Sequence, residues 1–193
     1  MRDELVMKIA LSLVFLLSLT TWFAAEHEGA QQKLVEPVIV ELDEMTIVGM
    51  QILYSMKCNL IPELWERLAA RMEEIKDVAR SDVAVEISYG TQREGAGETF
   101  LVLVGLIVNS IEEIPEGMTY KHVPAHKYAT FTHYGPISKI YETYDRIYNK
   151  LLPNSAYDVD QDACTIEWYD ERFKMDSPDS EYDIYVPVKE RQE

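Results

Sequence analysis

The chain has 193 residues, of which 18 are Lys or Arg and 34 are Asp or Glu, so its formal net charge at pH 7 is −16. Its hydrophobic share of 47% is too high for a disordered acidic tail. The acidic excess argues against a nucleic-acid-binding surface, which needs clustered Lys and Arg, so we expect no nucleic-acid partner. The length fits one domain, or two small halves that share a core.

An apolar segment opens the chain. Residues 9–25 contain no charged side chain, a run that is short for a membrane-spanning helix and long for the core of a signal peptide. We therefore expect residues 1–25 to be an export signal or a membrane anchor, and the protein to be exported or membrane-anchored, outside the cytoplasm. The polar residues 26–34 read as a linker, and residues 35–193 as the folded domain.

Two segments have the spacing of apolar residues that is typical of amphipathic helices. In the first segment these positions are Ile61, Leu64, Trp65, Leu68, Met72 and Ile75; in the second they are Ile137, Ile140, Tyr141, Tyr144, Tyr148 and Leu151. Each position of the second set lies 76 residues after its counterpart, which predicts that Trp65 and Tyr141 are equivalent. We expect the tyrosines of the second helix to pack in the core, with their hydroxyls at its solvent-exposed edge.

Short runs rich in β-branched and aromatic residues flank each of these helices, as strands do. Residues 42–50 align with 123–131, residues 85–89 with 165–169, and residues 100–104 with 182–186, at offsets of 80 to 82. The sequence therefore predicts an α+β fold made of two duplicated β-α-β-β units. We expect these units to be related by pseudo-twofold symmetry, with an antiparallel sheet and two main helices around a central groove.

One acidic residue stands out in these strands. At an offset of 80, Glu167 aligns with the apolar Ile87, and strand alternation places Glu167 on the same face as Thr165 and Tyr169. This carboxylate either faces solvent or lines an aromatic pocket. In the second case, burial without a partner costs free energy, so the carboxylate attracts a cation, which the aromatic faces attract further.

The order of motifs resembles the GyrI-like / AraC-type effector-binding domain over about residues 36–188. The matching runs are VELDEMTIVGM, IPELWERL, YATFTHYGP, LPNS, IEWYDERF and IYVP. The resemblance implies a groove that binds hydrophobic, often cationic, small molecules, with Glu167 as the acidic pocket residue and Trp65 as the helix tryptophan. Regulators of this family carry a DNA-binding domain, for which we expect no room in this chain.

From the residues and the resemblance together, we expect a ligand-binding site of one carboxylate and six aromatic side chains. The members are Glu167, Trp65, Tyr89, Tyr169, Tyr185, Phe100 and Tyr54. We expect it to sequester or sense a small hydrophobic, cationic ligand, with no catalytic residue, metal or cofactor. Two alternatives remain open: a hydrolase of strained-ring or other small genotoxic molecules, with Glu167 and a tyrosine as general base and acid, and a haem-binding carrier.

Overall fold

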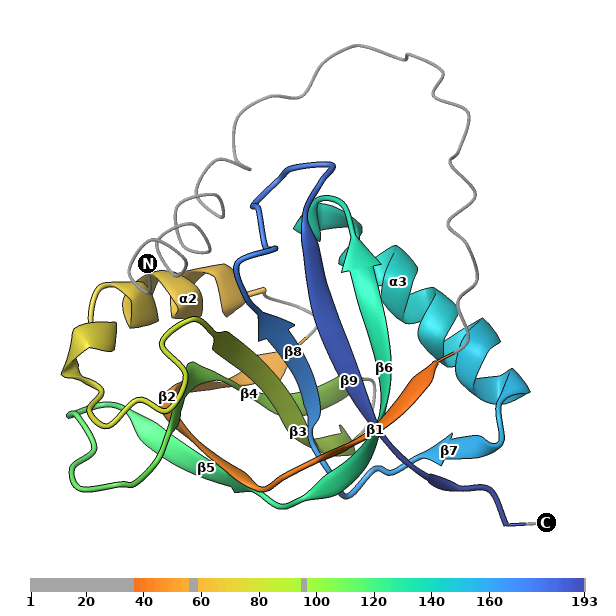
Figure 1. Ribbon diagram of the computed structural model, residues 1–193, viewed down its shortest axis with the longest axis horizontal. Helices are drawn as coiled ribbons and strands as arrows, with labels where there is room; N and C mark the ends of the chain where they lie inside the picture. The colour runs from red at the N-terminus through yellow and green to blue at the C-terminus, as the bar shows by residue number, and fades with distance from the viewer. Residues whose placement is uncertain (1–36, 56–58, 95–96, 193) are drawn as a thin grey trace.

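The runs predicted as strands form an antiparallel sheet in the computed structural model, which describes residues 37–55, 59–94 and 97–192 (Figure 1). The strand order is β1-β6-β9-β8-β3-β4-β2-β5, and β7 pairs with β9 outside this path. The strands are β1 (Val38–Leu42), β2 (Met45–Ser55), β3 (Ala84–Glu94), β4 (Gly97–Val108), β5 (Thr119–Val123), β6 (His126–Tyr134), β7 (Tyr157–Val159), β8 (Thr165–Tyr169) and β9 (Glu181–Glu190). The predicted export segment and linker lie outside the described residues. Within those residues, no helix is long and apolar enough to cross a membrane.

The pairing pattern is the same on both sides of the sheet's centre. Strand β1 pairs with β6, where Val38 opposes Thr130; strand β5 pairs with β2, where Thr119 opposes Gly49, and each of these residues lies 81 positions from its counterpart. At the centre β3 and β8 run antiparallel. This is the pairing that a duplicated unit would produce, although the duplication itself stays a prediction.

The first predicted helix forms as α2 (Ile61–Ala69), with Pro62 in its first turn, where a missing N–H leaves no hydrogen bond unmade. A short 3-10 helix (Met72–Glu74) continues it. Buried side chains on one face fix this helix against the sheet: Leu64, Trp65 and Leu68.

The second predicted helix is less regular. It starts as a 3-10 turn (Ile137–Lys139), becomes α3 (Ile140–Arg146) and ends in a π-helical turn (Ile147–Leu151). The expected equivalence of Trp65 and Tyr141 is wrong, because the Trp65 side chain is 2% exposed and that of Tyr141 is 61% exposed. The spacing of apolar residues indicates a helix, but it does not determine which residues of two different helices occupy equivalent positions.

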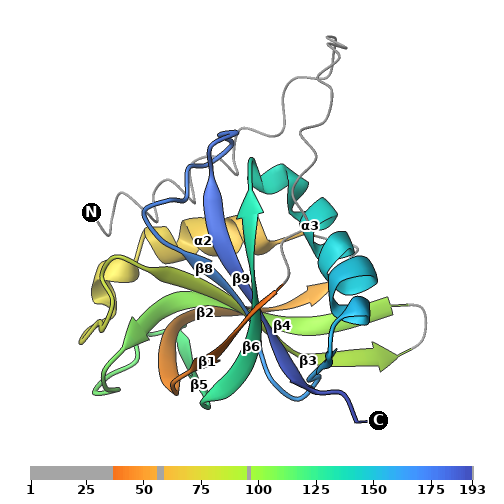
Figure 2. The ribbon, with the colours of Figure 1, turned by 45° about the vertical axis from the view of Figure 1, so that its right-hand side comes forward.

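Both helices pack on one face of the sheet (Figure 2). The main core joins them to side chains of β2, β4 and β9, among them Met50, Val104 and Ile184. A second apolar cluster lies on the opposite face and contains residues of the central strands and of both edge strands, such as Ile87 and Ile166 with Val40 and Val123. Two glycines let β2 and β4 approach closely, because a Cβ on Gly49 would lie 1.9 Å from the Val104 carbonyl oxygen and one on Gly105 would lie 2.4 Å from that of Val48.

Candidate ligand-binding site

A cavity of about 840 Å³ lies between α2, α3 and the face of the sheet that these helices cover. This volume is in the usual range for small-molecule sites. Aromatic side chains make up much of its lining: Tyr54, Trp65, Tyr89, Phe100, Tyr141, Tyr144, Tyr148, Tyr169 and Phe173. Three acidic residues also line it: Glu86, Asp160 and Glu167.

Two of these acids face each other at the centre of the sheet. Glu86 on β3 is directly opposite Glu167 on β8 in the antiparallel register. Side chains of directly opposed residues lie on the same face, with Cβ atoms about 4.5–5.5 Å apart. Both are buried, with 6% and 9% of their surfaces exposed. The cavity floor therefore holds a pair of carboxyl groups close together.

Two tyrosine hydroxyls donate hydrogen bonds to Glu167. Tyr144 Oη on α3 donates to Glu167 Oε1 at 2.6 Å, and Tyr169 Oη donates to Oε2 at 2.6 Å. Tyr169 is two residues along the same strand, so alternation brings its ring to the face that carries Glu167. Burial raises the pKa of Glu167, and the two hydroxyls oppose that rise because they stabilise the ionised form.

Glu86 has a different donor. The indole Nε1 of Trp65 on α2 donates to Glu86 Oε2 at 2.9 Å. Burial raises the pKa of Glu86 to about 8, the neighbouring Glu167 carboxylate contributes to the rise, and the indole N–H lowers it in part. At neutral pH this carboxyl group therefore favours its protonated form.

Ring contacts hold the walls around this pair. The ring centroids of Trp65 and Tyr169 lie 5.4 Å apart in an edge-to-face contact, and Tyr169 also packs against Phe173 at 5.0 Å. Tyr144 and Tyr148 stack at 6.0 Å, with Tyr148 placed by the π-helical turn. Such edge-to-face and offset pairs stabilise beyond the area that they bury, so these contacts help to hold the rings of the walls in place.

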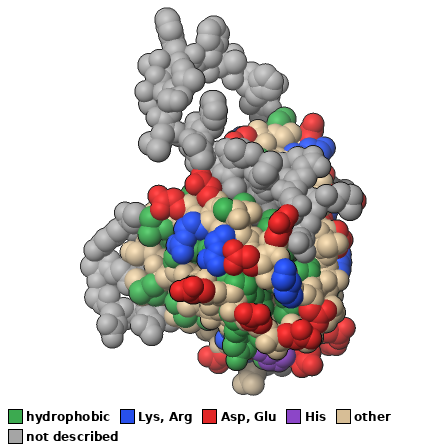
Figure 3. All heavy atoms as spheres, turned by 90° about the vertical axis from the view of Figure 1, so that its left-hand side faces the viewer, with side chains coloured by type: hydrophobic (Ala, Val, Ile, Leu, Met, Phe, Trp, Pro, Cys, Tyr) green, Lys and Arg blue, Asp and Glu red, His purple; other side chains and the backbone are tan. Residues whose placement is uncertain are grey.

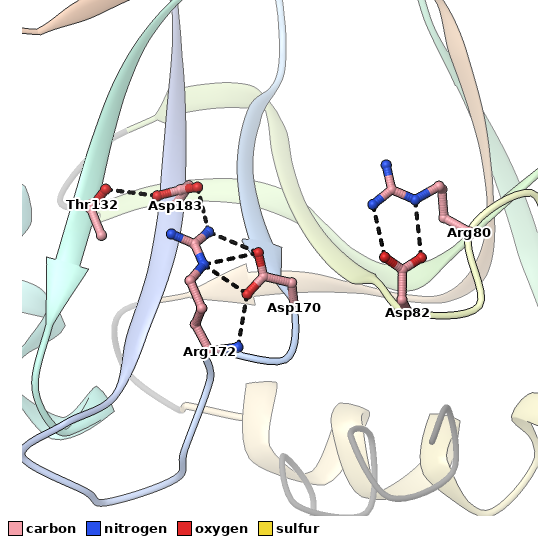
Figure 4. Close-up of polar contacts among 6 residues, drawn as sticks. All are labelled: Arg80, Asp82, Thr132, Asp170, Arg172 and Asp183. Atoms are coloured by element: carbon pink, nitrogen blue, oxygen red, sulfur yellow. Dashed lines mark hydrogen bonds and ion pairs between the residues drawn. The ribbon is translucent and has the colours of Figure 1, made fainter.

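An arginine clasp fixes the end of β8, where Tyr169 lies. The Arg172 guanidinium donates to Asp170, which follows Tyr169 directly, at 2.8 Å and to Asp183 on β9 at 2.6 Å (Figure 4). Thr132 on β6 donates to the other oxygen of Asp183 at 2.7 Å. The D-x-R part of the motif IEWYDERF therefore links the end of β8 to β9 and, through Asp183, to β6. These bonds fix the strand end that carries Tyr169 in the cavity wall.

The charge of the cavity is negative. Among the described residues that line it there is no Lys, Arg or His. On the face drawn in Figure 3, red acidic side chains lie between green apolar ones, in line with the acidic excess of the chain. The described residues contain no group of three His, Cys, Asp or Glu that could hold a metal ion. An apolar, aromatic and anionic enclosure matches the chemistry of a hydrophobic cation.

The structure brings most of the predicted site residues together. Tyr54, Trp65, Phe100, Glu167 and Tyr169 line the cavity. That they bind a ligand stays a prediction.

Tyr89 reaches only the edge of the cavity. Its ring packs against the second apolar cluster, its hydroxyl donates to Gln51, and the Lys121 ammonium lies 4.6 Å from its ring centroid. Strand alternation explains this edge position, because Glu86 faces the cavity and Tyr89, three residues later, faces the other side, as Ile87 does. A β-bulge after Tyr89, where Gly90 has a φ of +66°, interrupts the pairing with β4.

The placement of Tyr185 in the groove is wrong. Its ring packs with Tyr128 and Trp168 on the opposite face of the sheet. The physical reason is strand alternation: Ile184 of β9 opposes Glu167, so its neighbour Tyr185 points to the other side together with Ile166.

Sequence reasoning missed two of the central residues. The alignment at offset 80 sets Glu167 against Ile87 and therefore does not point to Glu86, whereas the strand pairing relates Glu86 and Glu167 at offset 81. Helical spacing predicts core packing for Tyr144 with its hydroxyl at the solvent-exposed edge, but it does not predict the acceptor of that hydroxyl, the Glu167 carboxylate. The available signal was the offset of 81 already present in the alignment of residues 42–50 with 123–131.

Comparison with known proteins identifies relatives of the whole described domain. The family of the GyrI-like small molecule binding domain matches residues 35–189. The transcriptional regulator BrlR of Pseudomonas aeruginosa is 35% identical over 151 residues, which cover 78% of this chain and 54% of the regulator. The chain thus spans about half the length of this curated relative.

Two solved structures share the fold. The structure of SAV2435 bound to tetraphenylphosphonium has a TM-score of 0.64 and 16% identity, and the match covers 80% of this chain and 94% of that chain. EcmrR in a complex with DNA has a TM-score of 0.62 and 14% identity, and the match covers 81% of this chain and 58% of that chain. These matches confirm the predicted α+β class with an antiparallel sheet and two helices.

The expectation of no nucleic-acid partner is not borne out by these comparisons. One relative is a transcriptional regulator, and another was solved with DNA. The net charge of this chain does not predict the nucleic-acid partners of the longer proteins in which such a domain occurs.

Proposed function

The chain belongs to the GyrI-like small molecule binding domain family, and we propose that its cavity binds hydrophobic organic cations, with Glu167 supplying the negative charge. The domain thereby sequesters or senses such compounds. The observation that carries this proposal is a buried carboxylate, held by two tyrosine hydroxyls inside an aromatic cavity. The fold neighbour solved with tetraphenylphosphonium, a bulky aromatic monocation, supports the same ligand class.

The physical argument for a cation is one of charge and area. Moving a carboxylate out of water is unfavourable unless an opposite charge or donors compensate, and a positive ligand compensates directly. Aromatic faces attract cations, and apolar substituents of the ligand gain free energy by burial at roughly 25 cal/mol per Å². A neutral compound of the same shape obtains the second contribution without the first.

Titration calorimetry on the full chain tests the proposal. Tetraphenylphosphonium should bind with one site per chain, and triphenylphosphine oxide, a neutral compound with similar phenyl groups, should bind at least about tenfold more weakly, the factor for 1.4 kcal/mol. Equal affinity for the two compounds would contradict the proposal, since the cavity would then read shape and not charge. Ligand recovered chemically unchanged supports a binder; consumption in excess of protein would favour the hydrolase alternative.

We also propose that the domain works outside the cytoplasm, from the uncharged run of residues 9–25. A reporter enzyme that is active only outside the cytoplasm, fused after Lys33, should be active. Recovery of the full-length protein in the soluble cytosolic fraction would contradict this.

A further inference from the structure

The two carboxyl groups at the cavity floor form a pair rather than two separate acids. Glu86 and Glu167 are in direct register across the central strands, and both line the same cavity. Two carboxylates at this separation, shielded from water, repel each other strongly when both are ionised. One of them therefore keeps a proton near neutral pH, and the pair titrates as a unit.

The donors decide which member keeps the proton. Glu167 accepts from two hydroxyls, those of Tyr144 and Tyr169, and such bonds stabilise an ionised carboxylate. Glu86 accepts from the Trp65 indole. With fewer donors at equal burial, Glu86 is the member that stays protonated, which agrees with its pKa of about 8. The negative charge of the ligand-free pair then rests on Glu167.

The groups around the pair do not supply a competing positive charge. From α2 it faces Trp65, from β2 Tyr54, from α3 and the following π-helical turn Tyr144 and Tyr148, from β8 Tyr169 and from β9 Tyr182. Burial raises the pKa of each of these tyrosines, so they stay neutral below pH 9. The third acid of the lining, Asp160, has the His126 ring nitrogen 3.6 Å from its carboxylate. Among the described groups that surround the pair, its own carboxyl proton is therefore the one that a cationic ligand can displace near neutral pH.

We propose that Glu86 and Glu167 act as one paired-carboxylate subsite, which releases its proton to solvent when an organic cation enters. This deepens the proposed function and rests on it. The ligand's positive charge stabilises the doubly ionised pair, so Glu86 loses its proton as the cation arrives. Glu86 thereby sets the charge that the pair presents: one negative charge without ligand, and up to two with a cation bound. Affinity for a permanent monocation then rises with pH.

Proton release can be counted directly. Tetraphenylphosphonium is titrated into the full chain at pH 7 in phosphate and in Tris. The buffer takes up each released proton, so its heat of protonation, which differs between the two buffers, adds to the signal. We expect a measurable release, above zero and at most one proton per ligand. The dissociation constant should fall by up to tenfold per pH unit between pH 6.5 and 8 and level off above, the limit for one proton.

Two variants separate the pair from the rest of the acidic chain. Glu86→Gln keeps an oxygen acceptor for the Trp65 indole and should bind the cation with neither proton release nor pH dependence in this range. Glu171→Gln removes an exposed carboxylate four residues after Glu167 and outside the cavity lining, and should behave as the unaltered chain. Binding without proton release in the unaltered chain, or equal release in Glu86→Gln, would overturn the paired subsite and leave the proposed function standing.

Failure of the cation to bind would overturn both the proposed function and the proposed proton release. The protonation of the pair can also be measured without ligand. With glutamate carboxyls carbon-13 labelled, infrared spectroscopy at pH 7 should show the carbonyl band of a protonated acid, and Glu86→Gln should remove it. If that band is absent from the unaltered chain, the pair holds no proton and the proposal is wrong.

Discussion

The two halves of the cavity hold the same acid in the same place and surround it differently. Glu86 and Glu167 oppose each other across the central strands, one next to the indole of Trp65 and the other between the hydroxyls of Tyr144 and Tyr169. Each carboxyl group accepts from the helix of its own half, α2 or α3. Glu86 accepts a hydrogen bond from one indole N–H, whereas Glu167 accepts hydrogen bonds from two tyrosine hydroxyls. Two identical residues at corresponding places thereby become chemically distinct.

The largest effect should come from removing the two carboxyl groups in turn. Glu167→Gln should weaken tetraphenylphosphonium binding at pH 7 by about 10- to 150-fold, corresponding to roughly 1.5–3 kcal/mol for a charge-assisted contact. Glu86→Gln should weaken binding less than Glu167→Gln at that pH, since the amide resembles the protonated acid of the ligand-free pair and only the charge gained on proton release is lost. Calorimetry on both variants checks the contrast, and similar losses would show that the halves are equivalent.

Double-mutant cycles sharpen the contrast between the donors. Tyr144→Phe and Glu167→Gln, made singly and together, should couple by about 1.5–3 kcal/mol in the free energy of unfolding, the range for hydrogen bonds to charged groups. Trp65→Phe and Glu86→Gln should couple by about 0.5–1.5 kcal/mol, the range for a neutral pair. Urea unfolding at pH 7 measures both. A larger coupling on the Trp65 side would mean that Glu86 carries the charge.

The arginine contacts give a third comparison, between the end of β8 and the approach to β3. Arg172 bonds to both Asp170 and Asp183, whereas Arg80 pairs with Asp82, and both partners of that pair are half exposed (Figure 4). Arg172→Gln should therefore lower the free energy of unfolding by about 1.5–3 kcal/mol. Arg80→Gln should lower it by less than about 1 kcal/mol, as surface ion pairs do. The reverse order in thermal or urea unfolding would show that the clasp does not hold the cavity wall.

The last comparison is a slope of stability with pH. Because folding raises the pKa of Glu86 from 4.5 to about 8, the folded chain binds more protons than the unfolded chain between these values, and the free energy of unfolding falls as pH rises through them. One proton limits the slope to about 1.4 kcal/mol per pH unit. Urea unfolding between pH 5.5 and 8.5 should show this fall, weaker in Glu86→Gln and unchanged in Glu171→Gln. A fall of the same steepness in Glu86→Gln would assign it to other groups.

Strand patterns predicted the fold and half of this contrast. Alternation placed Glu167 and Tyr169 on one face, and the structure agrees. The same rule applied to β9 would have kept Tyr185 out of the cavity, since Tyr182 and Ile184 alternate with it. Glu86 could not be paired with Glu167 from an alignment one residue out of register, because a single-residue slip exchanges the two faces of a strand. The hydroxyl of Tyr144 depended on how α3 sits on the sheet, which helical spacing does not fix.

In the proposed function, the charge of Glu167 recognises the charge of the ligand. One thermodynamic cycle gives the most direct test of this recognition. Tetraphenylphosphonium and triphenylphosphine oxide are each titrated into the unaltered chain and into Glu167→Gln at pH 7. Glu167→Gln should weaken binding of the cation by about 10- to 150-fold and binding of the neutral compound much less, because the neutral compound binds through apolar contact alone. Equal losses for the two compounds would contradict it and make Glu167 a structural residue.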